Sequence, residues 1–580
     1  MSMTHTNPDS HLQSAANSFA APPFTSSQTA LFQSYDHANK DGLRYKDYCI
    51  FEQGAWEALS QEDRDIISNE YNPEIGRYLI IAENGFFAAS DNKKYPLVED
   101  GNTAFFLDHC QIDILWKVDQ RRLYYYGRNP INNCICWIPD TDEIWLKRQL
   151  AAFAVQLQKI INSVSHPDLE KNQTELAVAV KKALAAEKRN IESRYIAFAG
   201  RSRQLIIERI KESVANNLIV FDDPQKVGHL LNCPNGTYNM RSRQLETPCK
   251  DHYITQGCLT EYHKDAESEV WTNFIETIAP TADIRKQLAQ SLGVALDASV
   301  SVKKLFLMYG RTTNNGKTTL INVLKNVLGK ADKGGYVSSI SAGTFDMGAR
   351  SGGKNTPELA SVGSARILTM SEPRENQPID WSYIKDATGG GEISITPKYK
   401  DTYTVMAAYT LFIESNYLIR LDDPTLFSSG RMFIIPFLAN LAEIGVDLNM
   451  PAKLREKRCR EAALAWILHG YTDYKDNDET FTIPKESQTI LAGYQAASDK
   501  IKDFMDEFFV PSKSPMSYVK LKEIHRLFKK YCAEKGYRPE GYGVFTNKLV
   551  SRGYDIKENS DKTKCIYGIE KKPEYRQQAS

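Results

Sequence analysis

Leu305-Phe-Leu-Met-Tyr309 leads into Gly310-Arg-Thr-Thr-Asn-Asn-Gly-Lys-Thr-Thr319, which is followed by Leu320-Ile-Asn-Val-Leu-Lys-Asn-Val-Leu328. This order of a short apolar run, a polar loop and an amphipathic segment predicts a strand, a phosphate-binding loop and a helix. The backbone amides of such a loop, together with the amino terminus of the helix, bind phosphate groups. The stretch therefore predicts an α/β domain that binds a nucleotide.

The polar side chains of the loop have separate predicted roles. We expect Lys317 to reach the β- and γ-phosphates and Thr318 to offer its hydroxyl to Mg²⁺. The first glycine usually lies five positions before the second, which here is Arg311, whereas Gly310 lies six positions before Gly316. The predicted ATP-binding residues are Gly310, Asn315, Gly316, Lys317, Thr318 and Thr319.

Three further residues at the ends of apolar runs are candidates for catalysis. Ala365-Arg-Ile-Leu-Thr-Met-Ser-Glu372 ends in a carboxylate, so Glu372 can hold Mg²⁺ or activate water, although Ser371 stands where many ATPases carry Asp. The next apolar run ends at Asn416, whose amide can orient the attacking water. Arg431 opens another run and is a candidate arginine finger, a role that spacing alone does not decide.

Taken in order, these residues resemble a superfamily 3 helicase of the AAA+ class. The resemblance is to the phage/plasmid primase-helicase family, whose poxvirus relatives share the same helicase module. Asn315-Gly-Lys-Thr318 resembles the first motif, and Ser371-Glu-Pro373 resembles the second. Ser415-Asn416 resembles the sensor asparagine, and Gly430-Arg431 stands where the family often has an Arg-Arg pair that includes the trans-acting arginine.

A third stretch resembles the motif that is peculiar to this superfamily. It is Ile384-Lys-Asp-Ala-Thr-Gly-Gly-Gly-Glu-Ile393, followed by Pro397-Lys-Tyr-Lys400. In relatives this motif forms a β-hairpin that carries basic residues into a central channel, whereas a solvated hairpin tip is the alternative. The family usually has Gly-Gly-Asp where this chain has Gly389-Gly-Gly391, which leaves the acidic role open. The predicted DNA contacts here are Lys385, Lys398 and Lys400.

The resemblance spans roughly residues 100–440, because Asp222-Asp-Pro224 and Leu230–Met240 resemble the segment before the helicase module. It implies a ring, usually a hexamer, that moves along one strand with 3′→5′ polarity. In that ring ATP would lie between subunits, Glu372 would polarise water, and Arg431 of a neighbour would stabilise the transition state.

We expect a multidomain α/β protein with smaller modules at both ends. Residues 543–552 read as a helix after a first helix at 519–531, and a hairpin pattern follows, which suggests a winged helix. Residues 491–580 carry 18 basic and 12 acidic side chains, a net charge of +6, so Lys548 and Arg552 are predicted to bind duplex DNA, with a packing module as the alternative. The expected domains are a disordered tail at 1–38, a mixed α+β region of primase-helicase type at 39–265, the AAA+ P-loop ATPase domain at 266–445, a helical connector at 446–495 and a winged-helix-like domain at 496–575.

The amino-terminal region lacks two signals of a catalytic primase. It has no convincing Asp-x-Asp pair on a strand and no zinc-ribbon cysteines, so we expect no primase activity in this chain. Cys134 and Cys136 form the closest cysteine pair, and one pair is too few for a zinc site. We therefore predict an ordinary strand there.

The composition limits where DNA can be bound. The chain has 72 basic and 72 acidic residues, and this balance excludes a uniformly basic nucleic-acid coat. No run of about 18 apolar residues occurs, and the start lacks a signal-peptide pattern, so we expect a cytoplasmic protein without membrane contact.

The sequence therefore predicts an ATP- and Mg²⁺-dependent DNA helicase for replication of a phage, prophage or plasmid-like element. Its expected partners are single-stranded and forked DNA, further copies of itself in a homo-hexamer or similar ring, and a possible separate primase or polymerase. An ATP-regulated origin-binding initiator without processive unwinding is the alternative. An ATPase without a nucleic-acid role, such as a defence or packaging motor, is a third class.

Overall fold

The chain divides into two compact units in a computed structural model. The amino-terminal unit is Met1–Tyr126 with Ile138–Ile219, and the carboxyl-terminal unit is Gly127–Trp137 with Val220–Ser580. No helix within the described ranges combines the length and the apolar character that a membrane crossing requires. The structure describes residues 48–52, 57–70, 72, 78–82, 95–163, 175–300, 303–346, 359, 362–363, 365–374, 377, 379–395, 403–419, 421, 426, 429–445, 447–497, 499–535 and 539–575.

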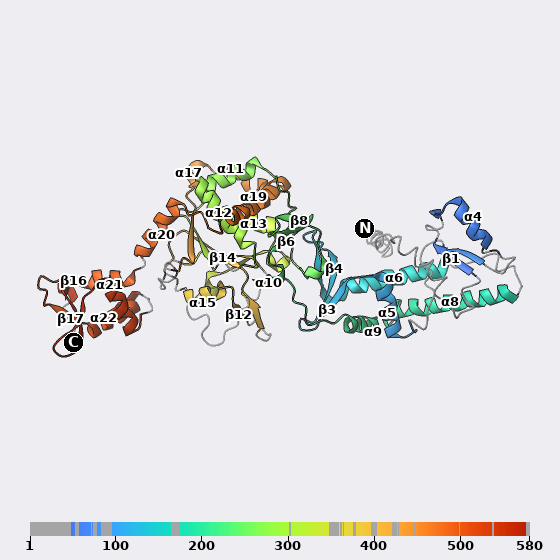
Figure 1. Cartoon of the computed structure of the whole chain (residues 1–580), viewed down its shortest axis with the longest axis horizontal. Helices are drawn as coiled ribbons and strands as arrows, with labels where there is room; N and C mark the ends of the chain where they lie inside the picture. Colours follow the sequence, from blue (N-terminus) through green and yellow to red (C-terminus); the bar gives the residue numbers. More distant parts are fainter. Residues whose placement is uncertain are drawn as a thin grey trace, which may run out of the picture. The chain divides into compact units, whose positions relative to one another are not determined.

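The amino-terminal unit is mainly helical, and α6 and α8 run side by side in it (Figure 1). Asp140 caps the first turn of α6, because its two carboxylate oxygens accept hydrogen bonds from the backbone amides of Trp145 and Leu146 at 2.9 and 3.0 Å. Phe106 and Phe198 lie in the buried core between the helices. The helices are α4 (Gln61–Glu70), α5 (Glu99–Cys110), α6 (Ile144–Ser163), α8 (Glu175–Ala199) and α9 (Arg203–Ser213).

Two small sheets also occur in the first part of the chain. β1 (Tyr48–Glu52) and β2 (Tyr78–Ala82) form a parallel pair. β3 (Ile114–Lys117), β4 (Arg122–Arg128) and β5 (Ile135–Asp140) form a three-stranded sheet in the order β3-β4-β5.

A five-stranded parallel sheet, which includes the β14 labelled in Figure 1, is part of the carboxyl-terminal unit. Its strand order is β10-β11-β14-β9-β15. Its strands are mostly buried, as expected for a parallel sheet that is covered on both faces. The predicted α/β core with a strand before the loop and a helix after it is confirmed. The strands are β9 (Leu305–Tyr309), β10 (Val337–Ile340), β11 (Ile367–Met370), β14 (Thr410–Ser415) and β15 (Met432–Pro436).

Side chains alternate between the two faces of this sheet. Phe306 and Phe412 pack in the core that includes α11, α12, α13 and α19, whereas Leu307 and Leu411 pack in a second core that includes α15 and residues of α20. The helices are α10 (Pro224–Val227), α11 (Glu269–Ile278), α12 (Ala282–Ala295), α13 (Lys317–Leu328), α15 (Trp381–Ala387), α17 (Leu441–Ile444), α18 (Met450–Lys453), α19 (Lys457–Asp476) and α20 (Lys485–Ala497).

A short antiparallel sheet packs against the same core. It consists of β6 (Leu230–Cys233), β7 (Gly236–Asn239) and β8 (Gln244–Glu246). The buried guanidinium of Arg366, which precedes β11, donates to the carbonyl oxygens of Leu230 and Leu296 at 2.6 Å each. These two bonds fasten β6 and the end of α12 to the parallel sheet.

The hairpin that the sequence predicts after α15 has two described strands. β12 (Glu392–Ile395) and β13 (Tyr403–Met406) pair antiparallel, with Glu392 opposite Met406. The connection between them lies outside the described residues, and with it Lys398 and Lys400. The predicted tail at 1–38 also lies outside them.

The last part of the chain has its own core, in which Phe504, Phe528 and Phe545 are buried. A helix, two strands, two helices and a hairpin follow one another, and the order of the three-stranded sheet is β17-β19-β18. This order is compatible with a winged helix, which stays a prediction. The elements are α21 (Lys500–Phe508), β16 (Phe509–Pro511), β17 (Tyr518–Lys520), α22 (Leu521–Lys535), α23 (Tyr542–Val550), β18 (Ile556–Glu558), β19 (Lys564–Tyr567) and β20 (Ile569–Lys571).

Candidate nucleotide-binding site

The phosphate-binding loop lies at the carboxyl end of β9, where the neighbouring parallel strands also end. Two glycines of the loop have no room for a side chain. A Cβ on Gly310 would lie 2.3 Å from Nδ2 of Asn315 and 2.6 Å from the carbonyl oxygen of Phe437. Gly316 has a φ of 88°, and a Cβ on it would lie 2.3 Å from Cγ2 of Ile278. Gly310 is therefore needed at its place despite its unusual spacing.

Lys317 has a buried ammonium with two side-chain partners. Its Nζ donates to Oδ1 of Asn315 at 2.9 Å and to Oδ1 of Asn416 at 2.8 Å. Burial lowers the pKa of Lys317 to about 8, although the carboxylates of Glu372 and Glu414 act in the opposite direction. A buried cation whose partners are neutral amides is a strong attractor for phosphate oxygens.

Asn416 joins this ammonium to Glu372. The carboxylate of Glu372 accepts a hydrogen bond from the backbone amide of Asn416 at 2.8 Å and from its Nδ2 at 3.0 Å. Both polar atoms of the Asn416 side chain are thus engaged, Oδ1 by Lys317 and Nδ2 by Glu372. The structure therefore brings the predicted lysine, carboxylate and asparagine into one continuous hydrogen-bonded group.

Glu414 is a residue of this site that the sequence reasoning missed. The Thr318 hydroxyl donates to Oε2 of Glu414 at 3.0 Å. Burial raises the pKa of Glu414, whereas the hydrogen bond from Thr318 and the charge of Lys317 lower it. The signal was present, because Glu414 is the charged residue in an otherwise uncharged run that ends at the predicted Asn416.

Arg431 lies away from the loop of its own chain. Its carbonyl oxygen accepts a hydrogen bond from the amide of Leu305, the first residue of β9, so it lies at the end of the sheet opposite the loop. Its guanidinium donates to the carbonyl oxygen of Lys385 at 3.4 Å. Burial lowers the pKa of Lys304, and the charge of Arg431 adds to this effect.

The two predicted DNA contacts of the last module are held by acids of that module. Nζ of Lys548 lies 2.7 Å from Oε1 of Glu540. Arg552 donates to both carboxylate oxygens of Asp499, at 3.1 and 2.8 Å. Binding of either cation to DNA would have to compete with these ion pairs.

The residues of the loop region fit a magnesium nucleotide. Mg²⁺ prefers oxygen ligands, and Thr318, Glu372 and Glu414 supply a hydroxyl and two carboxylates. The buried ammonium of Lys317 fits the phosphates. Thr319 follows on the first turn of α13, where a further loop contact is expected.

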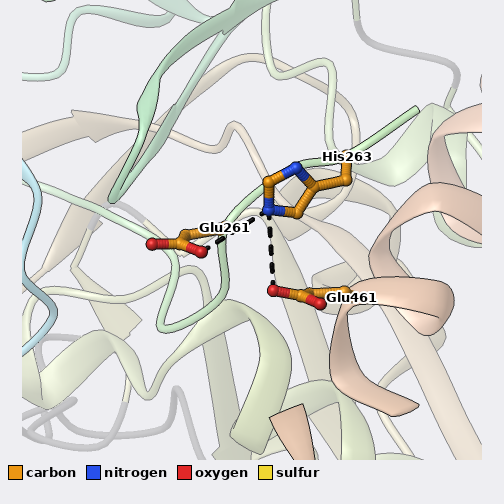
Figure 2. A group of neighbouring side chains, drawn as sticks. All are labelled: Glu261, His263 and Glu461. Atoms are coloured by element: carbon orange, nitrogen blue, oxygen red, sulfur yellow. Dashed lines mark hydrogen bonds and ion pairs between the residues drawn. The ribbon is translucent and has the colours of Figure 1, made fainter. Parts of the chain in front are cut away.

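A second group of possible metal ligands lies apart from the loop. Figure 2 shows Nε2 of His263 facing Glu261 and Glu461, at 3.5 and 3.6 Å from their carboxylate oxygens. Nζ of Lys457 lies 2.8 Å from Oε2 of Glu261 and lowers the pKa of that carboxyl group. The ammonium of Lys457 already balances the charge of these carboxylates. We therefore interpret the group as a set of ion pairs, and not as a metal site, that connects the segment before α11 to α19. Cys134, where we predicted no metal, is buried, and its Sγ donates to the carbonyl oxygen of Cys258 at 3.3 Å.

Comparisons with known proteins agree with the motifs. Residues 105–280 match the family model described as D5 N terminal like. A protein of Acanthamoeba polyphaga mimivirus that is named as a candidate helicase is 22% identical to this chain over 305 residues, which are 49% of this chain and 30% of that protein. The chain thus spans about 30% of the length of this curated relative.

Two solved structures show a weak likeness to this chain. The NrS-1 C-terminal region is 12% identical, with a TM-score of 0.33 over 54% of this chain and 77% of that chain. The JCV helicase is 13% identical, with a TM-score of 0.26 over 61% of this chain and 97% of that chain. The family model and the mimivirus relative confirm the predicted resemblance of this chain to the phage and viral primase-helicase family.

Proposed function

We propose that this protein is a ring-forming, ATP-dependent DNA helicase that moves with 3′→5′ polarity and serves the replication of a phage, prophage or plasmid-like element. The observation that carries the proposal is the continuous group of Lys317, Asn416 and Glu372 at the phosphate-binding loop. The match to the D5 N terminal like model and the mimivirus relative support a role in replication.

In the proposed reaction each residue of this group has one task. Lys317 binds the β- and γ-phosphate oxygens, and Glu372 accepts a proton from the attacking water that Asn416 helps to orient. Thr318 offers its hydroxyl to Mg²⁺, which when bound neutralises charge on the phosphates. The loop amides hold the nucleotide in place, which lowers the entropy cost of the reaction.

The proposed ring follows from the place of Arg431. All five residues of β15 lie between Arg431 and the end of the sheet where the loop binds phosphate, so Arg431 cannot reach its own nucleotide. A head-to-tail contact would bring it to the nucleotide of a neighbour, where its guanidinium stabilises the transition state. Such head-to-tail contacts close into a ring when the rotation between subunits closes, and we propose that here they form a homo-hexamer.

DNA contact is proposed at the β12–β13 hairpin, which carries Lys398 and Lys400 in its connection. Contacts of this kind bind the phosphate backbone without sequence preference and weaken with salt. The last module, with Lys548 and Arg552, is proposed as a second contact for forked DNA. A separate primase or polymerase would extend the strands that are opened.

Mixed rings test the arginine and the ring together. Lys317→Ala and Arg431→Ala are each expected to abolish hydrolysis when pure. When the two variants are mixed, some interfaces combine an intact Lys317 with an intact Arg431, and about a quarter of the interfaces in a random mixture should do so. Recovery of a comparable fraction of the ATPase rate supports the proposal, whereas no recovery in rings that native mass measurement shows to be mixed contradicts it.

Unwinding separates the helicase from the alternatives. Forks with opposite single-stranded tails, incubated with ATP, are expected to open from the 3′ tail only. Sequence-specific duplex binding without strand displacement would favour the initiator instead. An ATPase rate that single-stranded DNA does not change would favour an ATPase without a nucleic-acid role.

A further inference from the structure

We propose that Glu414 on β14 supplies the carboxylate that positions Mg²⁺ beside Thr318, and that Glu372, which follows the end of β11, is thereby left to act on the attacking water. This inference rests on the proposed ATPase function. Sequence motifs place the metal-positioning acid at the end of β11, whereas this proposal places it on β14.

The sheet places Glu414 directly beneath the start of α13. Phe412 and Glu414 are two residues apart on one strand, so their side chains point to the same face. Phe412 packs in the same core as Leu320 and Leu324 of α13, which identifies that face as the one that α13 covers. Since Glu414 lies near the carboxyl end of β14, it meets the first turn of the helix, where Thr318 is.

The hydrogen bond between the two residues has the direction that metal binding needs. The Thr318 hydroxyl donates its hydrogen to Oε2 of Glu414 at 3.0 Å. A hydroxyl that donates its hydrogen in this way keeps its lone pairs for a cation. Glu414 therefore both orients the Thr318 oxygen and places a negative charge next to it.

In many ATPases an aspartate at the end of the strand equivalent to β11 positions the metal ion. In this chain that position is not acidic. Ser371 stands there, and its hydroxyl is directed to the carbonyl oxygen of Ile340 on β10, at 3.5 Å. A serine hydroxyl also carries no charge with which to balance Mg²⁺. A carboxylate on the adjacent strand can therefore take the role that an aspartate at position 371 would have, because β11 and β14 are paired.

Glu372 is committed to other partners. Both of its carboxylate oxygens accept hydrogen bonds from Asn416, one from the backbone amide and one from the side chain. The two acids of the site therefore have different partners, Thr318 for Glu414 and Asn416 for Glu372. Different partners indicate separate tasks, metal positioning for the first and water activation for the second.

Metal affinity, measured apart from turnover, tests this assignment. The probe is Mn²⁺, whose binding to the complex of full-length protein with ADP is followed by electron paramagnetic resonance. Glu414→Gln is expected to weaken Mn²⁺ binding about tenfold or more, the range found when partners that orient metal ligands are removed. It should leave ADP affinity in EDTA within about twofold. Glu276→Gln, at an exposed position on α11, is the matched control and should change neither quantity.

Glu372→Gln completes the comparison. It is expected to lower kcat strongly and to leave Mn²⁺ affinity within about twofold. Equal loss of Mn²⁺ affinity in both variants, or a loss in Glu372→Gln alone, overturns the division of tasks. Thermal melting checks that Glu414→Gln is folded, and if it is not, Glu414→Asp is used, which keeps the charge but shortens the reach and should also weaken Mn²⁺ binding.

Failure of the proposed function would look different. If the unaltered protein binds ADP neither with Mn²⁺ nor in EDTA, the nucleotide site itself is wrong. If it binds ADP and Mn²⁺ normally and Glu414→Gln does the same, the site stands and the assignment of Glu414 is wrong.

Discussion

Nucleotide binding by this protein is expected to take up a proton at alkaline pH. The burial that lowers the pKa of Lys317 to about 8 favours the neutral amine in the free protein. Phosphate oxygens bring negative charge to the ammonium and raise its pKa again. Because the pKa is higher in the complex than in the free protein, binding takes up a fraction of a proton that grows with pH and exceeds about one half above pH 8.

The size of the effect follows from the pKa. With a value of about 8 in the free protein, the ammonium is about 90% protonated at pH 7 and about 10% protonated at pH 9. If the complex holds a fully charged Lys317, binding takes up about 0.1 proton at pH 7 and about 0.9 proton at pH 9. Affinity for the nucleotide should accordingly fall by about tenfold for each pH unit well above 8.

Calorimetry with ADP at pH 9 measures the uptake. The observed heat is compared in two buffers of different ionisation enthalpy, and its difference gives the number of protons bound. Lys317→Arg is the control, because a guanidinium stays charged throughout this range and should bind without uptake. Binding at pH 9 with no proton uptake in the unaltered protein would refute the reasoning, since Lys317 would then be charged before the nucleotide arrives.

Three substitutions test other parts of the structure. Gly316→Ala should abolish ADP binding in a fluorescence titration, because the new Cβ would lie 2.3 Å from Ile278 at a φ of 88°, and normal binding would show that the loop is not held there. Arg366→Ala should lower the free energy of unfolding by about 3 kcal/mol in urea, because it leaves two buried carbonyls without a donor; a loss below about 0.5 kcal/mol would contradict this. Asp499→Ala should lower the stability of the last module by about 1–2 kcal/mol, because it removes the cap of α21 and the pair with Arg552, and an unchanged melting curve would count against it.

Four of the five strands of the parallel sheet could be predicted because each contains a short apolar run. The run before the loop was placed at Leu305–Tyr309, where β9 lies. The runs that end at Glu372 and Asn416 became β11 and β14, and parallel pairing brought their ends to the loop. Local pattern and the rule that ligands bind at the carboxyl ends of parallel strands were enough to find this group.

Contacts between distant residues could not be predicted in the same way. Glu414 was missed because its role depends on β14 lying beside β9, and this strand order cannot be read from the sequence. Lys548 and Arg552 were expected to bind DNA because the last module has a net positive charge. Net charge does not show that each of these two cations has an acidic partner within the module. The partner of Arg552 is Asp499, 53 residues away.

The position of Arg431 connects ATP hydrolysis with DNA movement in the proposed mechanism. Its guanidinium contacts the carbonyl oxygen of Lys385 in the last turn of α15, and β12 of the hairpin begins at Glu392, shortly after that helix ends. In the proposed ring the same guanidinium would bind the phosphates of a neighbour's nucleotide. An arginine that exchanges the Lys385 carbonyl for a phosphate oxygen alters a contact of the helix that leads into the hairpin. Hydrolysis in one subunit would thus act on the hairpin that we propose to contact DNA in the next subunit, which is what stepwise movement around a ring requires.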